Sequence, residues 1–311
     1  MPLQENDISW DVLRQIVHAW AGARAELIEV RHLVGGCVNT TVALTTADGG
    51  RAVLKISPHR VSRELQRESH QLHMLKKLGL PVPQVYASHV ATLDNPNSYI
   101  LMEFVDGVDL NIARKRCSPE EFDGLQQHLA ELVLSLHANT STHYHRHEPE
   151  EPQRFDSWAE FYRHVYSPIW GELEKSPTLP VKARRQIERV HDRLDRLLAH
   201  DDQPRLVHWD IWAANVLTKP DGQGRWRITA LLDPNCKYAH AEAEIAYMEL
   251  FNTITPAFLK TYQKQRPLAE TYHRVRKPIY QLFPLINDVN LFGNGYLKPL
   301  LAMLDRVAPL L

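Results

Sequence analysis

Alternating apolar and polar positions in the first hundred residues predict a sheet of short strands. Residues 28–46 alternate branched apolar with polar side chains around a Gly35-Gly36 break, and a second turn at residues 47–50 precedes the apolar run 51–57. Such turns between alternating runs are typical of hairpins, so we expect three consecutive antiparallel strands.

One helix and two more strands are expected next. Four leucines recur at near-helical spacing between residues 61 and 79: Leu65, Leu72, Leu75 and Leu78. Gly79, followed by two prolines, marks the exit from this helix. Residues 85–90 and 98–105 then have the composition of strands. The expected order is three strands, one helix and two strands.

Beyond Gly107 the periodicity becomes helical. Ser118 and Glu121 form a capping box ahead of an apolar stripe over residues 122–136, and Ser157 with Glu160 suggests a second box. A further amphipathic helix is expected over residues 187–198, and helical pattern returns from His240 to the chain end, with interruptions at Pro267 and Gly293.

Composition changes this picture little, but it excludes several classes of protein. The 311 residues are 44% hydrophobic and 23% charged, which disfavours wholesale disorder, collagen-like repetition and coiled coil. Thirty-six Lys and Arg against 37 Asp and Glu leave a net charge of -1, so no overall field attracts nucleic acid or anionic membrane. The length suggests two domains or one two-lobed unit.

Cysteine usage and the N-terminal sequence indicate a cytoplasmic protein. Cys37, Cys117 and Cys236 are too scattered for a disulfide framework, which fits a reducing compartment. The N-terminus has no apolar stretch after a basic start, so we expect no secretory signal. No apolar run reaches the length of about 18 residues that a membrane span requires.

The sharpest chemical signal lies between residues 206 and 233. His208 and Asp210 follow a short apolar run, Asn215 comes five residues after Asp210, and Asp233 ends a second apolar run. This is the spacing of phosphoryl-transfer loops, in which the first Asp accepts a hydroxyl proton while Asn and the second Asp hold Mg²⁺. The alternative is that these residues only form turns. We expect His208 to brace the loop by hydrogen bonding.

Complementary parts occur upstream. Lys55 lies in an otherwise apolar strand, where it would meet nucleotide phosphates, and Glu68 on the following helix would orient it. Glu64, one turn earlier, is the competing partner, and a solvated edge-strand lysine is the alternative for Lys55.

Two further segments are candidates for nucleotide contact. Gly35, Gly36, Cys37 and Asn39 form a hairpin whose backbone N–H groups would approach phosphates, although most glycine pairs are only turns. Cys37 there is either an oxidisable thiol, able to join two chains, or a small residue without redox duty. The segment 103–105 (Glu103, Phe104, Val105) would offer backbone groups to adenine, or act as a plain linker.

The sequence resembles the fructosamine/ketosamine kinase family, a branch of the aminoglycoside phosphotransferase and protein-kinase-like superfamily. The matching segments run nearly end to end: residues 35–39, Lys55, Glu68, residues 208–215, 233–234, 238–246, 280–282 and 290–296. The catalytic segments are shared across the superfamily, whereas the last segment and Trp212 favour the ketosamine branch.

The resemblance implies an α+β, protein-kinase-like fold of two lobes. The N-lobe, residues 1–105, would be a small antiparallel sheet with one key helix, and the C-lobe, residues 106–311, would be larger and mainly helical. ATP and Mg²⁺ would lie between them, with Trp212, His240 and Glu244 on the acceptor side.

The resemblance also implies an activity: ATP-dependent phosphorylation of a sugar hydroxyl by a ketosamine (fructosamine or ribulosamine) 3-kinase acting in deglycation. The expected partner is a small glycated amine or aminosugar, not nucleic acid or membrane, and the chain would be a monomer or homodimer. The alternatives are an aminoglycoside-type or other small-molecule O-phosphotransferase, and a nucleotide-binding pseudokinase scaffold.

The chain also departs from the family pattern. Trp209 and Ala239 stand where Gly is usual, and Asp288 stands where His is common. We expect Trp209 to alter packing or the substrate side, not metal chemistry. The polar segment 142–154 replaces the usual family phrase. Its alternating His143, His145 and His147 indicate a solvated surface loop, with adventitious Zn²⁺ binding as the alternative.

Overall fold

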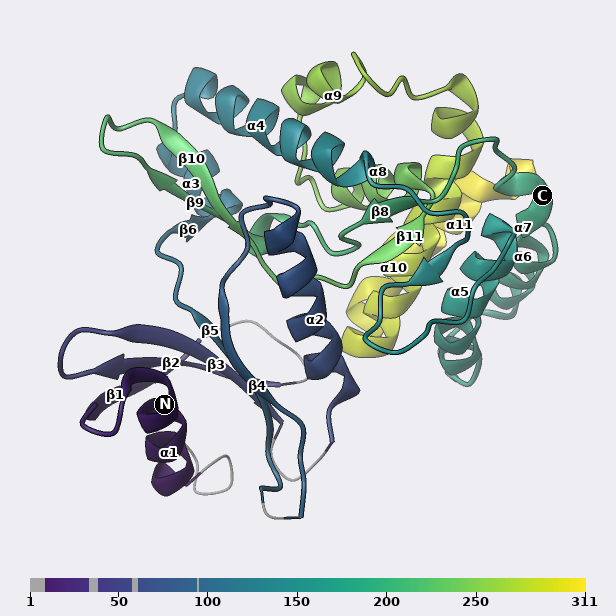
Figure 1. Cartoon of the computed structure of the whole chain (residues 1–311). Helices are drawn as coiled ribbons and strands as arrows, with labels where there is room; N and C mark the ends of the chain where they lie inside the picture. Colours follow the sequence, from purple (N-terminus) through teal and green to yellow (C-terminus); the bar gives the residue numbers. More distant parts are fainter. Residues whose placement is uncertain (1–8, 34–38, 58–60, 94) are drawn as a thin grey trace.

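The computed structural model describes residues 9–33, 39–57, 61–93 and 95–311, which form a sheet-rich end and a larger helical end (Figure 1). The sheet-rich end holds antiparallel strands in the order β1-β2-β3-β5-β4. Their bounds are β1 Leu27–His32, β2 Thr40–Thr46, β3 Arg51–Ser57, β4 Val85–His89 and β5 Ser98–Glu103. The expected order of three strands, one helix and two strands is confirmed, with β3 in the centre.

Helix α1 (Trp10–Ala21) precedes this sheet and is an element that the strand pattern does not predict. Ser9 caps its start, accepting a hydrogen bond from Val12 N. Its buried side chains Leu13, Ile16 and Val17 join the apolar cluster formed by β2, β3 and β5. The expectation of mainly strand in this part of the chain is therefore wrong for residues 10–21, where the helical spacing of these apolar positions was the available signal.

Helix α2 (Arg63–Lys77) is the expected helix between strands. Three of its apolar positions are buried: Leu65, Leu72 and Leu75. Leu78, the fourth leucine of the predicted stripe, follows the helix and is 38% exposed, so its assignment to the stripe is wrong. Gly79 has φ of +79°, which glycine adopts without strain, and it ends the helix as predicted.

A buried glutamine ties α2 to the larger end of the molecule. The side-chain oxygen of Gln71 accepts a hydrogen bond from Cys236 N at 2.8 Å, and its Nε2 donates to the His147 carbonyl at 2.7 Å. Gln71 is fully buried, so these bonds are shielded from water. The position of α2 is therefore set by both ends of the molecule.

After β5 the chain enters two small sheets. The first has the order β10-β9-β6 and the second β7-β11-β8. Their bounds are β6 Val108–Asp109, β9 Val216–Pro220, β10 Trp226–Leu231, β7 His145–Arg146, β11 Lys237–Ala239 and β8 Arg205–Val207. The first sheet begins directly after the linker from β5, and the second holds the segments that flank the catalytic residues.

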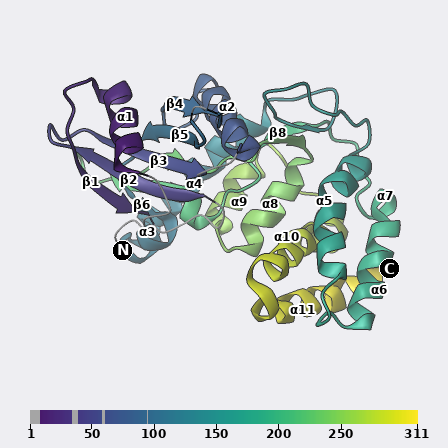
Figure 2. The same cartoon turned by 90° about the horizontal axis from the view of Figure 1, so that it is seen from below.

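Helices make up most of the larger end. They are α3 Leu110–Arg116, α4 Pro119–His137, α5 Trp158–Glu174, α6 Val181–Asp192, α7 Leu194–Leu197, α8 Ala241–Leu250, α9 Pro256–Tyr262, α10 Lys277–Phe292 and α11 Leu297–Val307. In Figures 1 and 2, α5, α6, α7 and α11 lie at the end of the molecule away from the five-stranded sheet. A single large apolar cluster runs through these helices and reaches α2 and β4.

One of the two predicted capping boxes is present. Ser118 Oγ accepts from Glu121 N, and Glu121 Oε2 accepts from Ser118 N, as predicted. The second box is wrong, because Ser157 makes no side-chain capping bond and α5 starts instead at a buried Trp158. The helix expected over residues 187–198 is divided at Arg193 into α6 and α7.

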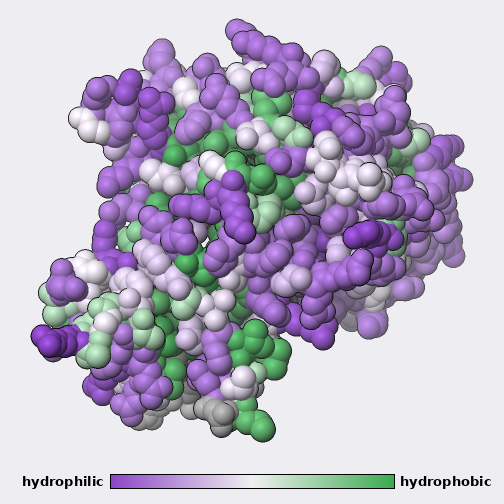
Figure 3. Space-filling model, in the orientation of Figure 1, coloured by the Kyte–Doolittle hydropathy of each residue, from purple (hydrophilic) through white to green (hydrophobic). Residues whose placement is uncertain are grey.

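No described helix is both long enough and apolar enough to cross a bilayer. The face of the molecule in Figure 3 is mainly hydrophilic, with apolar side chains in small separate groups.

Gly107 should be essential for the junction between the linker and β9. A Cβ at this position would lie 2.7 Å from the Thr218 carbonyl oxygen, which is backbone and must shift. We expect Gly107→Ala to lower the free energy of unfolding by about 1–3 kcal/mol in urea denaturation. The control is Gly124→Ala in α4, where a Cβ meets nothing within 4 Å. It should raise stability by up to about 1 kcal/mol, and equal stabilities for the two variants would contradict this account.

Candidate active site

A buried ammonium group joins the two ends of the molecule. Lys55 Nζ, on central strand β3, donates to Glu68 Oε1 on α2 and to Asp233 Oδ1, each at 2.6 Å. Burial alone would lower the pKa of Lys55, but the two carboxylates outweigh burial and raise the pKa above its ordinary value. Glu64 is exposed and is not the partner. The alternative of a solvated edge-strand lysine is wrong, because β3 lies between β2 and β5.

Asp210 lies in the loop after β8, held by two hydrogen bonds. Its Oδ1 accepts from the Tyr247 hydroxyl at 2.5 Å, and its Oδ2 accepts from Asn215 Nδ2 at 3.0 Å. Burial raises the pKa of Asp210 to about 7, although the bond from Tyr247 opposes the rise. A carboxylate with this basicity and fixed orientation is suited to accept a proton.

Asn215 and Asp233 present oxygen atoms of the type that Mg²⁺ prefers. The amide of Asn215 donates to Asp210, which leaves its Oδ1 without a donor among the described residues. Asp233 Oδ1 accepts a hydrogen bond from Lys55, and no described residue donates to Asp233 Oδ2. The Leu232 N–H bonds to the Asn215 carbonyl at 2.9 Å and ties the two segments together. This donor set fits Mg²⁺.

His208 holds the same loop through its backbone and not through its ring. Neither ring nitrogen has a hydrogen-bond partner among the described residues, and burial lowers the pKa of His208 to about 4. The His208 carbonyl accepts from Asn235 N at 3.0 Å. His208 therefore braces the loop by a hydrogen bond of its backbone, as expected, while its uncharged ring packs in the interior.

Trp209 adopts a strained backbone that a buried carboxylate stabilises. Its φ is +71°, a conformation that costs a non-glycine residue about 1–2 kcal/mol. The backbone N–H of Trp209 donates to Glu244 Oε1 at 2.7 Å. The other carboxylate oxygen, Glu244 Oε2, bonds to His137 Nε2 at 2.8 Å. Glu244 and His137 are fully buried or nearly so. The positive φ explains why glycine is expected at this position.

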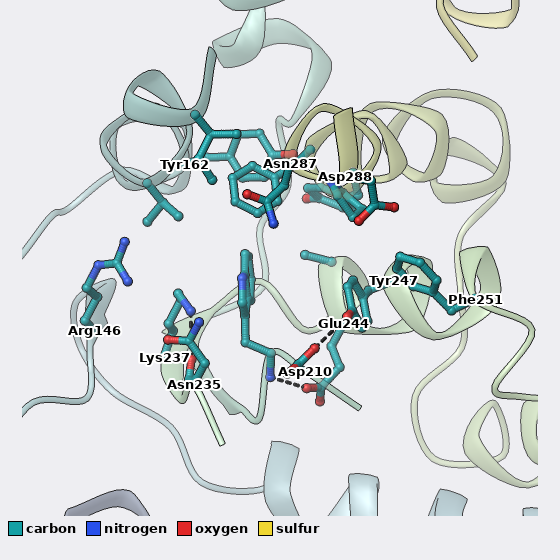
Figure 4. A pocket seen from close by; sticks show the side chains of 17 residues that line it. Arg146, Tyr162, Asp210, Asn235, Lys237, Glu244, Tyr247, Phe251, Asn287 and Asp288 are labelled. Carbon is teal, nitrogen blue, oxygen red and sulfur yellow. Dashed lines mark hydrogen bonds between the residues drawn. The ribbon is translucent and has the colours of Figure 1, made fainter. Parts of the chain in front are cut away.

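A cavity of about 330 Å³ opens beside Asp210 (Figure 4). Asp210 and Glu244 form one side of it, and Asn287 and Asp288 from α10 face them across the space. Arg146 closes a third side. The remaining walls are largely aromatic and include Tyr162, Trp209, Tyr247, Phe251, Tyr280 and Phe283. The size and lining of this cavity suit a small polar molecule with a hydroxyl near Asp210.

The residues predicted for the acceptor side are only partly brought together. Glu244 lines the cavity, but Trp212 and His240 do not. Trp212 is 39% exposed. His240 is buried elsewhere, where its Nδ1 lies 2.7 Å from the Tyr280 hydroxyl and its ring stacks on His200. The indole that lines the cavity belongs to Trp209. This position fits the expectation that Trp209 alters packing or the substrate side.

The linker between the five-stranded sheet and the helical end is clamped by an arginine. Arg51 on β3 places its guanidinium 4.4 Å from the centre of the Phe104 ring and bonds to Asp106 at 2.8 Å. Glu103 ends β5 opposite Ala52, so Phe104 and Val105 leave the sheet beside the start of β3 at Arg51. Contact between these residues and adenine stays a prediction.

Part of the expected phosphate loop lies outside the described residues. Gly35, Gly36 and Cys37 belong to this part, so the backbone nest and the redox hypothesis stay predictions. Asn39 is described, and its side-chain oxygen accepts a hydrogen bond from the Ser57 hydroxyl.

The segment with three alternating histidines is not a solvated loop. His145 and Arg146 form β7, which pairs with β11, and His147 N bonds to the Cys236 carbonyl at 3.0 Å. His143, His145 and His147 are all partly buried. No group of three or more metal-ligating side chains that could hold an ion occurs among the described residues, so these histidines do not form a zinc site there. The pattern of polar residues concealed the pairing with β11.

The chain is similar to known proteins along nearly its whole length. The family model described as fructosamine kinase matches residues 9–309. A protein of Vibrio parahaemolyticus named as a probable ketoamine kinase is 26% identical over 306 residues, spanning 96% of this chain and 99% of that protein. A chloroplastic protein-ribulosamine 3-kinase of Oryza sativa subsp. indica is 25% identical over 294 residues, spanning 91% and 80%.

Solved structures confirm the two-lobed, kinase-like fold. A structure from Thermobifida fusca, described as a fructosamine-3-kinase, has a TM-score of 0.73 at 22% identity and covers 97% of this chain and 100% of its own. A thermostable mutant of an aminoglycoside phosphotransferase, solved with AMP-PNP and hygromycin B, has a TM-score of 0.66 at 16% identity, covering 96% and 97%. At these identities the likeness establishes the fold alone.

Asp288 should make stability depend on pH. Burial raises the pKa of Asp288 to about 6 from the ordinary 3.8. Between these values the folded protein binds more protons than the unfolded chain, so the free energy of unfolding contributed by this group falls as pH rises. We expect Asp288→Asn to melt at an increasing temperature relative to wild type from pH 4 to 6, with a constant difference above about pH 7. The exposed Asp123→Asn is the control, and two parallel melting profiles for wild type and Asp288→Asn would refute the expectation.

Proposed function

The chain belongs to the fructosamine kinase family, and we propose that it is a ketosamine 3-kinase acting in deglycation, which transfers the γ-phosphate of ATP to a sugar hydroxyl. The relatives named as ketoamine and ribulosamine kinases support this reaction and this class of acceptor. The acceptor is a small glycated amine or aminosugar.

One observation carries the proposal: Asp210 belongs both to the cavity and to the polar cluster that includes Asn215. Its side chain lines the cavity, while its hydrogen bond to Asn215 links it to the segment bonded to Leu232, next to Asp233. An acceptor in the cavity and a phosphate beside Lys55 would therefore meet at this carboxylate. Phosphoryl transfer requires mainly such positioning and charge neutralisation.

Each residue then has a defined role. Lys55, oriented by Glu68, would contact the α and β phosphates, and Asn215 and Asp233 would hold Mg²⁺, which neutralises phosphate charge when bound. Asp210 accepts the proton of the acceptor hydroxyl. The oxygen of that hydroxyl then forms the new bond to the γ-phosphorus. The bond from that phosphorus to the leaving ADP oxygen breaks in the same transfer.

We also propose the arrangement of the nucleotide. The lobes are residues 1–105 and 106–311, and adenine lies against residues 103–105, which join them. The protein would act in the cytoplasm.

Two other functions are less well supported. The aminoglycoside phosphotransferase shares the fold with this chain, and its acceptor is not implied by that likeness. A pseudokinase would be expected to lack part of the transfer machinery, whereas Lys55, Asp210, Asn215 and Asp233 are all present. Trp209 lies in the cavity wall and not between Lys55 and its carboxylates.

The test measures phosphate transfer to fructosyl-lysine, ribulosyl-lysine and kanamycin with ATP and Mg²⁺, by the mass increment of the product. We expect transfer to the ketosamines, and a loss of about 10² to 10⁴ in rate for Asp210→Asn, because the proton acceptor is removed. Asp123→Asn on the exposed face of α4 should keep the wild-type rate.

A thermal-shift titration with ATP and Mg²⁺ separates binding from catalysis. Nucleotide binding without phosphate on any acceptor would show a pseudokinase. Full activity of Asp210→Asn would remove Asp210 as the base while leaving the reaction in place, and transfer to kanamycin alone would favour the aminoglycoside class.

A further inference from the structure

The cavity beside Asp210 is electrostatically divided. The cavity wall carries the carboxyl groups of Asp210, Glu244 and Asp288, and Arg146 with Lys237 supplies two basic groups in a separate part of it. Figure 4 shows Arg146, Lys237 and Asn235 on one side and Asp288, Tyr247 and Phe251 on the other. A molecule that fills the cavity would therefore meet opposite charges at its two ends.

The two basic residues are held together by sheet register. Arg146 on β7 is the direct antiparallel partner of Lys237 on β11. Cβ atoms of such partners lie about 4.5–5.5 Å apart, and like charges placed opposite each other are destabilising. The backbone bond from His147 N to the Cys236 carbonyl and the bonds of Gln71 fix this register. The fold thus maintains an unfavourable pairing in the wall of a cavity.

No carboxylate of the described residues forms an ion pair with Arg146 or Lys237, although Glu148 attracts Arg146 and Asp210 attracts Lys237 at longer range. Arg146 has neither an ion pair nor a side-chain hydrogen bond to any of them, and the adjacent Glu148 pairs with Arg67 at 3.6 Å. Lys237 is fully buried. Its Nζ donates to the Asn235 carbonyl at 2.7 Å, has no other acceptor among the described residues, and lies 4.5 Å from the Trp209 ring centre. Burial, with Arg146 nearby, lowers the pKa of Lys237 well below its ordinary value.

An anion in the cavity would remove both penalties at once. It would screen Arg146 from Lys237 and would favour the charged form of the lysine. A guanidinium presents parallel N–H groups that match a carboxylate, and charge-assisted bonds of this kind are among the stronger ones in proteins. A polycationic acceptor would instead meet the positive charge of Arg146 in the cavity wall.

We propose that Arg146 and Lys237 bind the carboxylate of the acceptor, so that the preferred substrate is the ketosamine of a free amino acid. This rests on the proposed function, which it narrows to a class of acceptor. The sugar hydroxyl then lies at Asp210, the amine faces the wall with Asp288, and the carboxylate lies against β7 and β11. Arg146 and Lys237 are specificity residues in this arrangement.

The test compares two acceptors of nearly equal size, fructosyl-glycine and fructosyl-glycinamide, with ATP and Mg²⁺. We expect wild type to have a KM about 10- to 100-fold lower for the acid, because the amide lacks the charge that Arg146 and Lys237 bind, with a much smaller change in kcat. Arg146→Gln should raise the KM for the acid several-fold toward that for the amide, because the guanidinium that binds the carboxylate is removed. Arg154→Gln is the matched control, since Arg154 is more than half exposed and pairs with Glu151 outside the cavity.

The outcomes separate this inference from the function on which it rests. Equal KM values for acid and amide in wild type would overturn the carboxylate site and leave the kinase activity standing. An unchanged preference in a folded Arg146→Gln would also overturn it. Should that variant unfold, Arg146→Lys and the wild-type comparison still decide, the lysine variant being expected to keep part of the preference. If wild type phosphorylates no ketosamine, the proposed function fails. The carboxylate site is then tested by thermal shifts with the same two acceptors, and equal shifts for acid and amide would count against it.

Discussion

The charge of Lys55 is the constraint on which the rest of the site depends. A buried ammonium is stable only if its partners stay in place, and removing one partner of such a buried pair typically costs about 3–5 kcal/mol. Glu68 and Asp233, the partners here, come from a helix of the small end and a loop of the large end. The two ion pairs that balance the charge of Lys55 therefore fix the relative position of β3, α2 and the loop that carries Asp233.

A second constraint acts on the catalytic loop from the opposite side. Glu244 is buried beneath the loop and accepts the Trp209 N–H, which offsets the cost of a positive φ in a large residue. Asp210 follows immediately, so its direction is set by this anchored backbone as well as by Tyr247. Asp210 is therefore oriented by contacts with both the backbone of its own loop and the helix α8.

The sequence predicted what depends on local spacing. Strand alternation gave the five-stranded sheet, and the interval from Asp210 to Asn215 identified a loop whose side chains do meet. The sequence did not predict the positions whose surroundings come from distant parts of the chain. Arg146 was hidden in a polar segment because its role comes from pairing with a distant strand, and no local pattern distinguishes Glu244 that lines a cavity from His240 that does not. The apolar spacing of helix α1 is helical, but it is short and stands next to a longer strand pattern.

The buried bonds of Gln71 have a consequence for control of the enzyme. Signalling kinases are switched off by swinging the helix that carries the glutamate away from its lysine. Here that helix is fastened, through Gln71, to the backbone at Cys236 and His147, and an outward swing would strand polar groups in a dry interior. Separating Lys55 from Glu68 by such a swing would therefore also break the buried bonds of Gln71, so the assembled arrangement is the stable one in this chain.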